Sequence, residues 1–227
     1  MDLLTLARGP LMQAATTIFV IGVLWRLVGV ALLRGTRNLS APRKAPWAGL
    51  RLLVMRSWPR KEFLGGTAFG EVMGYTFHVG LLVSIFFFLP HVLFFEDIAK
   101  TVTGLNFHRL AGFDWPTLPG SFIYFLTAIS VGCLIAVLIH RVVNPVKRLI
   151  SNFDDYFSWF VTVAPLATGM IAYGHFSGSH EMRLAVHLLS VELLMVWFPF
   201  GKLMHAFWLM ATRATQGLDF ERKGASI

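Results

Sequence analysis

The sequence predicts an all-α integral membrane protein, a bundle of five transmembrane helices. Hydrophobic residues make up 56% of the 227 residues, and the mean hydropathy is +0.64. Charged residues make up only 14%, against about 25% in an ordinary soluble domain. Five apolar stretches reach the ~20 residues that a spanning helix needs. These observations exclude a soluble globular enzyme, a disordered chain and a disulfide-rich secreted domain, and we expect one membrane domain over residues 1–227.

The predicted helices follow one another along the whole chain. They cover Leu11–Leu33, Phe69–Phe95, Ser121–His140, Tyr156–Phe176 and Leu184–Ala211. The second and the fifth are longer than a straight span requires, so we expect them to tilt or to extend beyond the hydrocarbon. The first lacks the basic leader and the small-residue cleavage site of a signal peptide, so we expect it to be retained.

Lysine and arginine are distributed unequally between the two sides of this bundle. The segments after the first and third helices and the tail carry Arg34, Arg37, Arg43, Lys44, Arg51, Arg56, Arg60, Lys61, Arg141, Lys147, Arg148, Arg213, Arg222 and Lys223. The opposite side carries only Arg8, Lys100, Arg109 and Arg183. By the positive-inside rule, the N-terminus is outside and the C-terminus is cytoplasmic. The loops therefore explain the net charge of +8, which does not indicate nucleic-acid binding.

The basic cytoplasmic loop 34–61 is the longest connection. Its prolines, Pro42, Pro46 and Pro59, prevent one continuous helix. It also carries apolar side chains, namely Trp47, Leu50, Leu52, Leu53 and Trp58. Two interpretations stay open: an interfacial loop that serves topology alone, or a contact with a cytoplasmic partner.

Four of the eight histidines fall inside two predicted helices, where an imidazole in hydrocarbon is unfavourable and therefore informative. His187 and His205 are 18 residues apart, which is five whole turns and about 27 Å of an ideal helix, so both are predicted on one face. His78 and His91 are 13 residues and about 20 Å apart. The two helices run in opposite directions. We therefore expect His78 and His205 at the cytoplasmic level, and His91 and His187 at the outer level.

Each pair can place one imidazole on either side of a haem iron, an arrangement that suits electron transfer because both axial positions are occupied. The chain has no C-x-x-C-H motif, so two non-covalent b haems are predicted. Zinc, which prefers three or four clustered ligands, is the weaker option. His78 and His91 stand about 140° apart around an ideal helix, and we expect a kink at Pro90 to bring both inward.

Charged residues near these levels are candidates for pairing with haem propionates. Lys202 lies three residues before His205, and Arg26 lies inside the first helix, where it needs a partner or water. Glu192 is an isolated carboxylate, expected to be hydrogen-bonded or protonated rather than catalytic. Some outer residues are candidates for a quinol pocket, namely Lys100, His108, Arg109, His175, His180 and Glu181.

The segment Leu184-Ala-Val-His187, followed by Trp197-Phe-Pro-Phe-Gly-Lys202-Leu-Met-His205, resembles the last membrane helix of the respiratory nitrate reductase gamma subunit family. Tyr75-Thr-Phe-His78-Val-Gly80, the run Ile21-Gly22 to Trp25-Arg26 and the chain length extend the resemblance over most of the chain. The family places its other helix-two histidine three positions before His91, where this chain has Phe88. This difference suggests a paralogue that serves another redox complex.

The resemblance implies a dihaem cytochrome b of the prokaryotic cytoplasmic membrane, with His78 and His205 on the inner haem and His187 on the outer one. Such a subunit exchanges electrons with quinol or quinone and passes them to a cytoplasmic iron–sulfur subunit and a catalytic subunit. Two alternatives remain. A transporter with a histidine relay would show internal repeats and broken helices, neither of which is evident in the sequence. A cofactor-free membrane anchor would leave the four histidines unexplained.

Overall fold

The computed structural model describes residues 2–32, 47–55, 57, 62, 64–106, 108, 112–174, 176 and 178–224. These residues are helical with no strand, and Phe88 and Leu118 form an isolated bridge. Four helices are long and apolar enough to span a membrane: Leu3–Ala31, Leu64–Phe87, Gly120–Val143 and Phe153–Tyr173. A bent pair, His180–Trp197 with Lys202–Glu221, makes a fifth if it is counted as one span. The described part of the chain is thus all-helical, and its long apolar helices are compatible with a multi-pass membrane protein.

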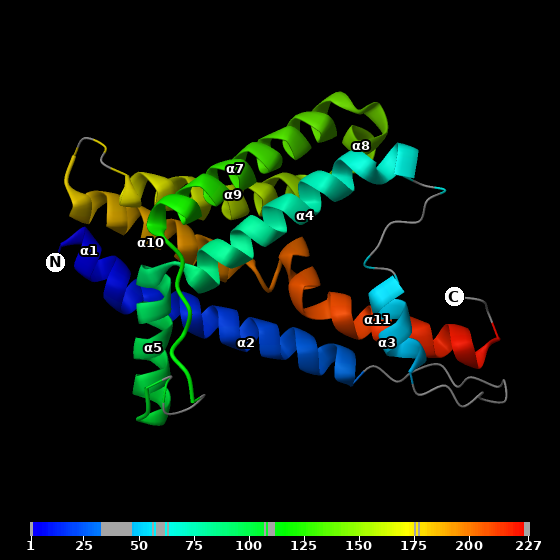
Figure 1. The fold of residues 1–227 in the computed structure, drawn as a ribbon, viewed down its shortest axis with the longest axis horizontal. Coiled ribbons are helices and arrows are strands. Elements are labelled where there is room, and N and C mark those ends of the chain that lie inside the picture. The colour runs from blue at the N-terminus through cyan, green and yellow to red at the C-terminus, as the bar shows by residue number, and fades with distance from the viewer. Residues whose placement is uncertain are drawn as a thin grey trace. The chain divides into compact units, whose positions relative to one another are not determined.

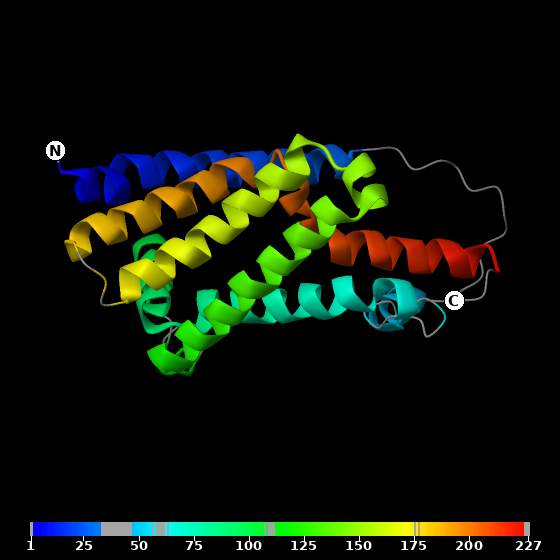
Figure 2. The ribbon, with the colours of Figure 1, turned by 90° about the horizontal axis from the view of Figure 1, so that it is seen from above.

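The helices group into two compact units. The first contains Met1–Ala68, Asn152–Val161 and Leu188–Ile227, and the second contains Phe69–Ser151 and Thr162–His187. Figures 1 and 2 show the same chain in two perpendicular views. Three helices, namely α4 (Leu64–Phe87), α9 (Phe153–Tyr173) and α10 (His180–Trp197), are continuous from one unit into the other.

The first unit begins with a helix that is longer than the sequence predicts. It starts at Leu3 as α1 (Leu3–Leu6), continues through the π-helical turn η1 (Ala7–Leu11) and becomes α2 (Met12–Ala31). Pro10 lies inside the π turn. A proline lacks the N–H that an α-helix needs, and a π turn is one local adjustment that accommodates it, so the helix does not begin at Leu11 as expected.

Small residues let backbones approach closely in the first unit. Helix α3 (Ala48–Met55) lies against α11 (His205–Arg222), where a Cβ on Gly217 would lie 2.5 Å from the Ala48 carbonyl oxygen. The side chain of Leu52 is 1% exposed in this contact. Within loop 34–61, positions 34–46, 56 and 58–61, with their basic residues, prolines and Trp58, lie outside the described residues.

The second unit is held by polar contacts between α4 and α7 (Gly120–Val143). The Ser84 hydroxyl donates to the Gly80 carbonyl oxygen at 2.7 Å, and its oxygen lies 2.8 Å from the hydroxyl oxygen of Thr127. A Cβ on Gly80 would lie 2.0 Å from the Ser130 hydroxyl oxygen, so this glycine sets how closely the two helices approach. Both serines are buried, which places the hydroxyl contacts in the packed interior.

The predicted helix Phe69–Phe95 is wrong as one continuous element. Helix α4 ends at Phe87, Phe88 is extended with φ −83° and ψ 123°, and α5 (Leu89–Thr103) begins next with Pro90 in its first turn. Figure 1 shows α5 crossing the direction of α4 steeply. The expected kink at Pro90 is confirmed as a full break, because a proline supplies no N–H and its ring clashes with the carbonyl of the residue four positions earlier, here Phe86.

The predicted helix Leu184–Ala211 is also interrupted. Helix α10 ends at Trp197, a turn covers positions 198–201, the short 3₁₀ helix η3 (Lys202–Met204) follows, and α11 begins at His205. The two halves are bent by 78°. Pro199 and the extended Gly201, with φ −97° and ψ −177°, stop the α-helical hydrogen bonding here. The expectation of five unbroken turns between His187 and His205 is therefore wrong.

Candidate functional site

Two of the predicted ligand histidines lie together in the second unit. The ring centres of His91, in the first turn of α5, and His187, in α10, are 6.2 Å apart, and their planes are inclined by 19°. Both side chains are partly buried. The break at Phe88 allows the two rings to approach. His91 lies in a new helix, so the angle of about 140° from His78 that a continuous helix would impose does not apply.

His91 is held where α4 ends. Its Nδ1 lies 2.8 Å from the carbonyl oxygen of Ser84, and the ring of Phe88 meets it edge to face at 5.2 Å between centres. His91 lies in α5, outside the four candidate spans. Burial lowers the pKa of this imidazole, and hydrogen bonds to the carbonyls of Ser84 and Ile85 oppose the shift. The neutral form, which is the form that binds a metal ion, is therefore favoured.

His187 packs against α9 at a glycine. A Cβ on Gly169 would lie 3.1 Å from the His187 Cε1 atom, so the absence of a side chain there makes room for the ring. The Nδ1 of His187 lies 3.3 Å from the Thr168 hydroxyl oxygen. That hydroxyl donates its own hydrogen to the Ala164 carbonyl at 2.7 Å, so it accepts from His187.

In all four predicted ligand histidines, Nδ1 lies within hydrogen-bond distance of an oxygen atom. The Nδ1 of His78 lies 2.7 Å from the Gly74 carbonyl oxygen, and that of His205 lies 2.8 Å from the Lys202 carbonyl oxygen. A carbonyl oxygen only accepts, so Nδ1 carries the proton at these positions and at His91. In a neutral ring, the lone pair then belongs to Nε2. A hydrogen bond from the other ring nitrogen to an oxygen acceptor is typical of histidines that bind metals.

His78 and His205 lie in different compact units, His78 on α4 and His205 at the start of α11. Both side chains are exposed, and the ring of Phe77 lies 4.0 Å from that of His78 between centres. Their assignment to one inner haem stays a prediction.

The spacing of the outer pair is compatible with one metal ion between the two rings. A metal ion bound through two imidazole nitrogens lies about 2 Å from each, which sets ring centres on opposite sides of one ion about 6 Å apart. The 6.2 Å between His91 and His187 agrees with this separation. Within the described part of the chain, no group of three or more His, Cys, Asp or Glu side chains is arranged to hold a metal ion. A bis-histidine haem needs only two.

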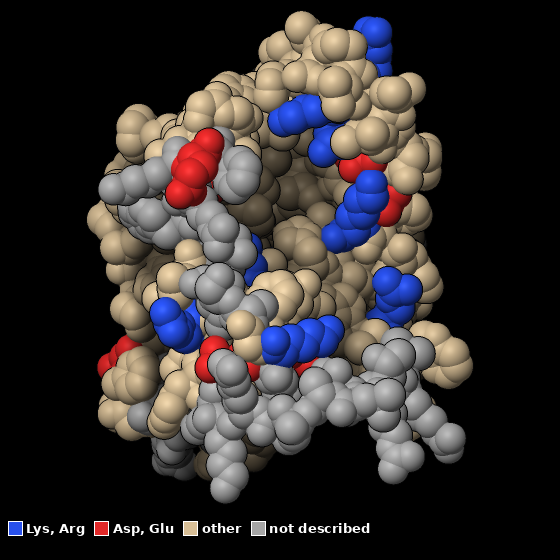
Figure 3. Space-filling view, turned by 90° about the vertical axis from the view of Figure 1, so that its right-hand side faces the viewer, with Lys and Arg blue, Asp and Glu red and all other residues tan. Residues whose placement is uncertain are grey.

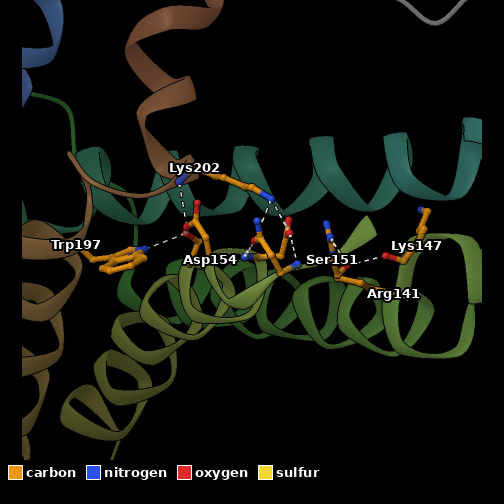
Figure 4. A network of polar contacts seen from close by, with 9 residues as sticks. Arg141, Lys147, Ser151, Asp154, Trp197 and Lys202 are labelled. Atoms are coloured by element: carbon orange, nitrogen blue, oxygen red, sulfur yellow. Dashed lines mark hydrogen bonds and ion pairs between the residues drawn. The ribbon is translucent and has the colours of Figure 1, made fainter. Parts of the chain in front are cut away.

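Lys202, the candidate propionate partner, takes part in a different contact in the first unit (Figure 4). Its Nζ lies 2.5 Å from the Asp155 carboxylate, whose side chain is 8% exposed, and its backbone N–H donates to the Asp154 carboxylate at 3.2 Å. Ser158 donates to the same Asp154 oxygen at 2.6 Å, and the Trp197 indole donates to Ser158 at 3.0 Å. We call these five residues the bend clamp, because they tie the turn after α10 to the first turns of α9.

Sequence reasoning missed the acceptors in the bend clamp. The available signal was the pair Asp154 and Asp155 at the start of a predicted helix, beside a basic residue in the next helix. Arg26 is exposed on α2, and its propionate role stays a prediction. Glu192 is buried in α10, with its Oε1 lacking a hydrogen-bond partner within the described chain.

The described residues among those considered for a quinol pocket come from separate segments of the chain. His108 contacts Asp114 at 2.9 Å, with both side chains exposed. Lys100 lies in the last turn of α5, and His180 and Glu181 begin α10. Arg109 and His175 lie outside the described residues. Arg183 donates to the carbonyl oxygens of Phe176 and Gly178, at 2.6 and 2.7 Å, and so secures the loop before α10.

Comparison with known proteins gives one relative that matches from end to end. A protein of Nitratidesulfovibrio vulgaris strain Hildenborough is 26% identical over 234 aligned positions, which cover 96% of this chain and 94% of that protein. No family model matches the chain, and no solved structure matches it.

Proposed function

We propose that the chain is a b-type cytochrome subunit of a membrane redox complex, in which His91 and His187 are the axial ligands of one haem b. The main support for this proposal is that the ring centres of His91 and His187 are 6.2 Å apart and that the Nδ1 atom of each ring makes a hydrogen bond. His78 and His205, whose Nδ1 atoms also contact backbone carbonyl oxygens, are the proposed ligands of a second haem b. A bound haem supplies an iron that cycles between its ferric and ferrous states and so carries one electron at a time.

The residues of the chain prepare the outer site for such a group. Ser84 and Thr168 hold the two imidazoles in the tautomer that presents Nε2, and Gly169 leaves space for the ring of His187. If His91 and His187 both bound the iron, the site would suit electron transfer rather than the binding of a small substrate to iron. Burial lowers the pKa of His91, which favours its neutral imidazole.

In the proposed topology, α10 and α11 count as one bent span, the N-terminus lies outside and the C-terminus is cytoplasmic. The excess of lysine and arginine in the cytoplasmic segments supports this orientation. The chain then connects the quinone pool, near His91 and His187, with a cytoplasmic iron–sulfur subunit and its catalytic partner. The resemblance to nitrate reductase gamma subunits supports the same arrangement in a prokaryotic cytoplasmic membrane.

Spectroscopy of the purified full-length chain tests this proposal. We expect a b-type alpha band in the dithionite-reduced minus oxidised spectrum and two haems per chain. His91→Ala and His187→Ala should each leave one haem, and so should His205→Ala. His108→Ala is the matched control, because that histidine is exposed and contacts Asp114, and it should leave both haems. A chain with no b-type band would overturn the haem assignment.

One observation favours a different class. The 78° bend between α10 and α11 is the kind of broken helix that transporters use. Of the two transporter features not evident in the sequence, internal repeats and broken helices, the second is therefore present. A transporter would contain no haem and would move protons or metal ions across vesicle membranes in a manner sensitive to the histidine substitutions. The haem count therefore separates the two functions.

A further inference from the structure

The corner between α7 and α8 (Pro145–Ile150) exposes an unusual amount of apolar surface. Val143 is 71% exposed, Leu149 is 85% exposed and Ile150 is 71% exposed, and Val146 adds to the same surface. Exposed apolar side chains of this size are unfavourable in water. They continue the exposed apolar residues of α7, which include Phe125, Ile129, Ile135, Ile139 and Val142. Since α7 is a candidate span, those α7 residues are suited to lipid.

This corner is rigid. The Asn144 side chain accepts from the N–H groups of Val146 and Lys147, at 3.0 and 3.1 Å, and so caps the N-terminus of α8. Arg141 donates to the Ser151 hydroxyl at 2.9 Å, and that hydroxyl donates to the Lys147 carbonyl oxygen at 2.6 Å (Figure 4). The two ends of the turn are thereby joined, so the apolar side chains are presented by a preformed surface.

The same corner is strongly basic. It carries Arg141, Lys147 and Arg148, and no acidic residue occurs between His140 and Ser151. The Lys147 ammonium donates to Nδ1 of His140 at 3.2 Å. Figure 3 shows several lysine and arginine side chains on the end of the molecule that faces the viewer. Exposed apolar side chains beside clustered positive charge match the two parts of an anionic phospholipid, its acyl chains and its phosphate.

We propose that the α7–α8 corner binds an anionic phospholipid, with Lys147 and Arg148 contacting the phosphate and Val146, Leu149 and Ile150 lying among the acyl chains. Basic side chains at a membrane surface each strengthen attraction to anionic lipid, while their aliphatic stems cover apolar surface. A lipid explains the corner better than a protein partner does, because the exposed apolar surface is continuous along the chain with that of a spanning helix. This site is independent of the haem assignment.

Native mass spectrometry of the purified full chain, exchanged into mixtures of phosphatidylcholine and phosphatidylglycerol, tests the proposal. We expect the wild type to retain phosphatidylglycerol preferentially. Arg148→Gln should weaken this retention about fivefold, and adding Lys147→Gln should weaken it again by about the same factor. The matched control, Lys100→Gln with Lys223→Gln, removes two exposed charges elsewhere and should leave retention unchanged.

Two further arms make the result decisive. Arg148→Lys should restore the preference, since it keeps the charge, and Leu149→Gln should weaken retention of phosphatidylglycerol without altering that charge. Free inorganic phosphate should not compete, because it lacks the acyl chains that the corner accommodates. Equal retention by the wild type and the double variant, with both folded by circular dichroism, would overturn the proposal. Loss of a co-purifying protein with unchanged lipid retention would overturn it in favour of a protein-docking surface.

Discussion

The ring centres of His91 and His187 lie 6.2 Å apart, although the two residues belong to the two separate chain segments that make up the second unit. A single extended residue, Phe88, starts a new helix whose first turn carries His91 towards α10. Hydrogen bonds then fix the tautomer of each ring. His91 donates to the Ser84 carbonyl oxygen, and His187 donates to the Thr168 hydroxyl, which itself donates to the Ala164 carbonyl oxygen. These contacts are the basis of the predictions that concern the proposed outer haem.

Gly169→Ala should reduce haem bound at the outer site. The new methyl group would lie 3.1 Å from Cε1 of His187, which is tighter than normal van der Waals contact, so the ring must shift from its present position. Haem content per chain and the electron paramagnetic resonance signal of each low-spin iron measure the effect. Gly132→Ala, on α7 with open space around its Cβ position, is the control and should leave both signals intact. Unchanged signals in both variants would contradict the expected displacement of the His187 ring by the new methyl group.

Lys202→Gln should destabilise the fold, because the mostly buried Asp155 carboxylate then loses its ion-pair partner. A loss of about 1–3 kcal/mol is expected for such a group, and Lys202→Gln combined with Asp155→Asn should cost less than the sum of the single changes. Thermal unfolding in detergent measures this coupling.

The same pair of variants separates the bend clamp from a propionate contact. If Lys202 contacts a haem propionate, Lys202→Gln alone should shift one haem midpoint potential, whereas Asp155→Asn should not. If the bend clamp is its main role, both substitutions should affect the haem bound at His205 alike, because the Lys202 carbonyl orients that ring. Lys202→Arg should restore part of the stability.

Gly80→Ala should separate α4 from α7. Its Cβ would lie 2.0 Å from the Ser130 hydroxyl oxygen and 3.1 Å from the Leu126 carbonyl oxygen, so the helices must move or Ser130 must change rotamer. Overpacking of this kind costs about 1–3 kcal/mol. Gly70→Ala, in the same helix with open space at its Cβ position, should be neutral or mildly stabilising. A lower unfolding temperature for Gly80→Ala alone would support the packing, and equal temperatures would contradict it.

Gly217→Val should release α3 from α11, because a Cβ at position 217 would lie 2.5 Å from the Ala48 carbonyl oxygen. Maleimide labelling of Leu52→Cys in a Cys133→Ser background reports this release, since Leu52 is 1% exposed and Cys133 is the chain's single cysteine. We expect the cysteine at position 52 to be labelled slowly when position 217 is Gly and rapidly in the Gly217→Val variant. Gly66→Val, where the Cβ position is open, serves as the control and should keep labelling slow.

Hydropathy and charge already determine much about this protein. Long apolar stretches with few charges favour spanning helices, because every backbone polar group in hydrocarbon must be satisfied within its own segment. The stretches expected at Ser121–His140 and Tyr156–Phe176 correspond to α7 and α9, with ends that differ by a few residues. The choice of His91 and His187 as a pair also came from the sequence, although it was argued from two continuous helices.

Only the tertiary structure decided how that pair forms and what surrounds Lys202. Helical periodicity predicts the direction of a side chain only while the helix continues. The predicted helices that contain the four histidines are interrupted at Phe88 and at positions 198–201. Past such a break, the direction of a side chain depends on contacts with segments distant in the sequence, such as Ser158 and Asp155 with the turn after α10. The sequence by itself determined the membrane character, the helical segments and the residue types available for a haem site. Long-range packing decided which ring faces which, because a one-dimensional pattern does not specify contacts across a broken helix.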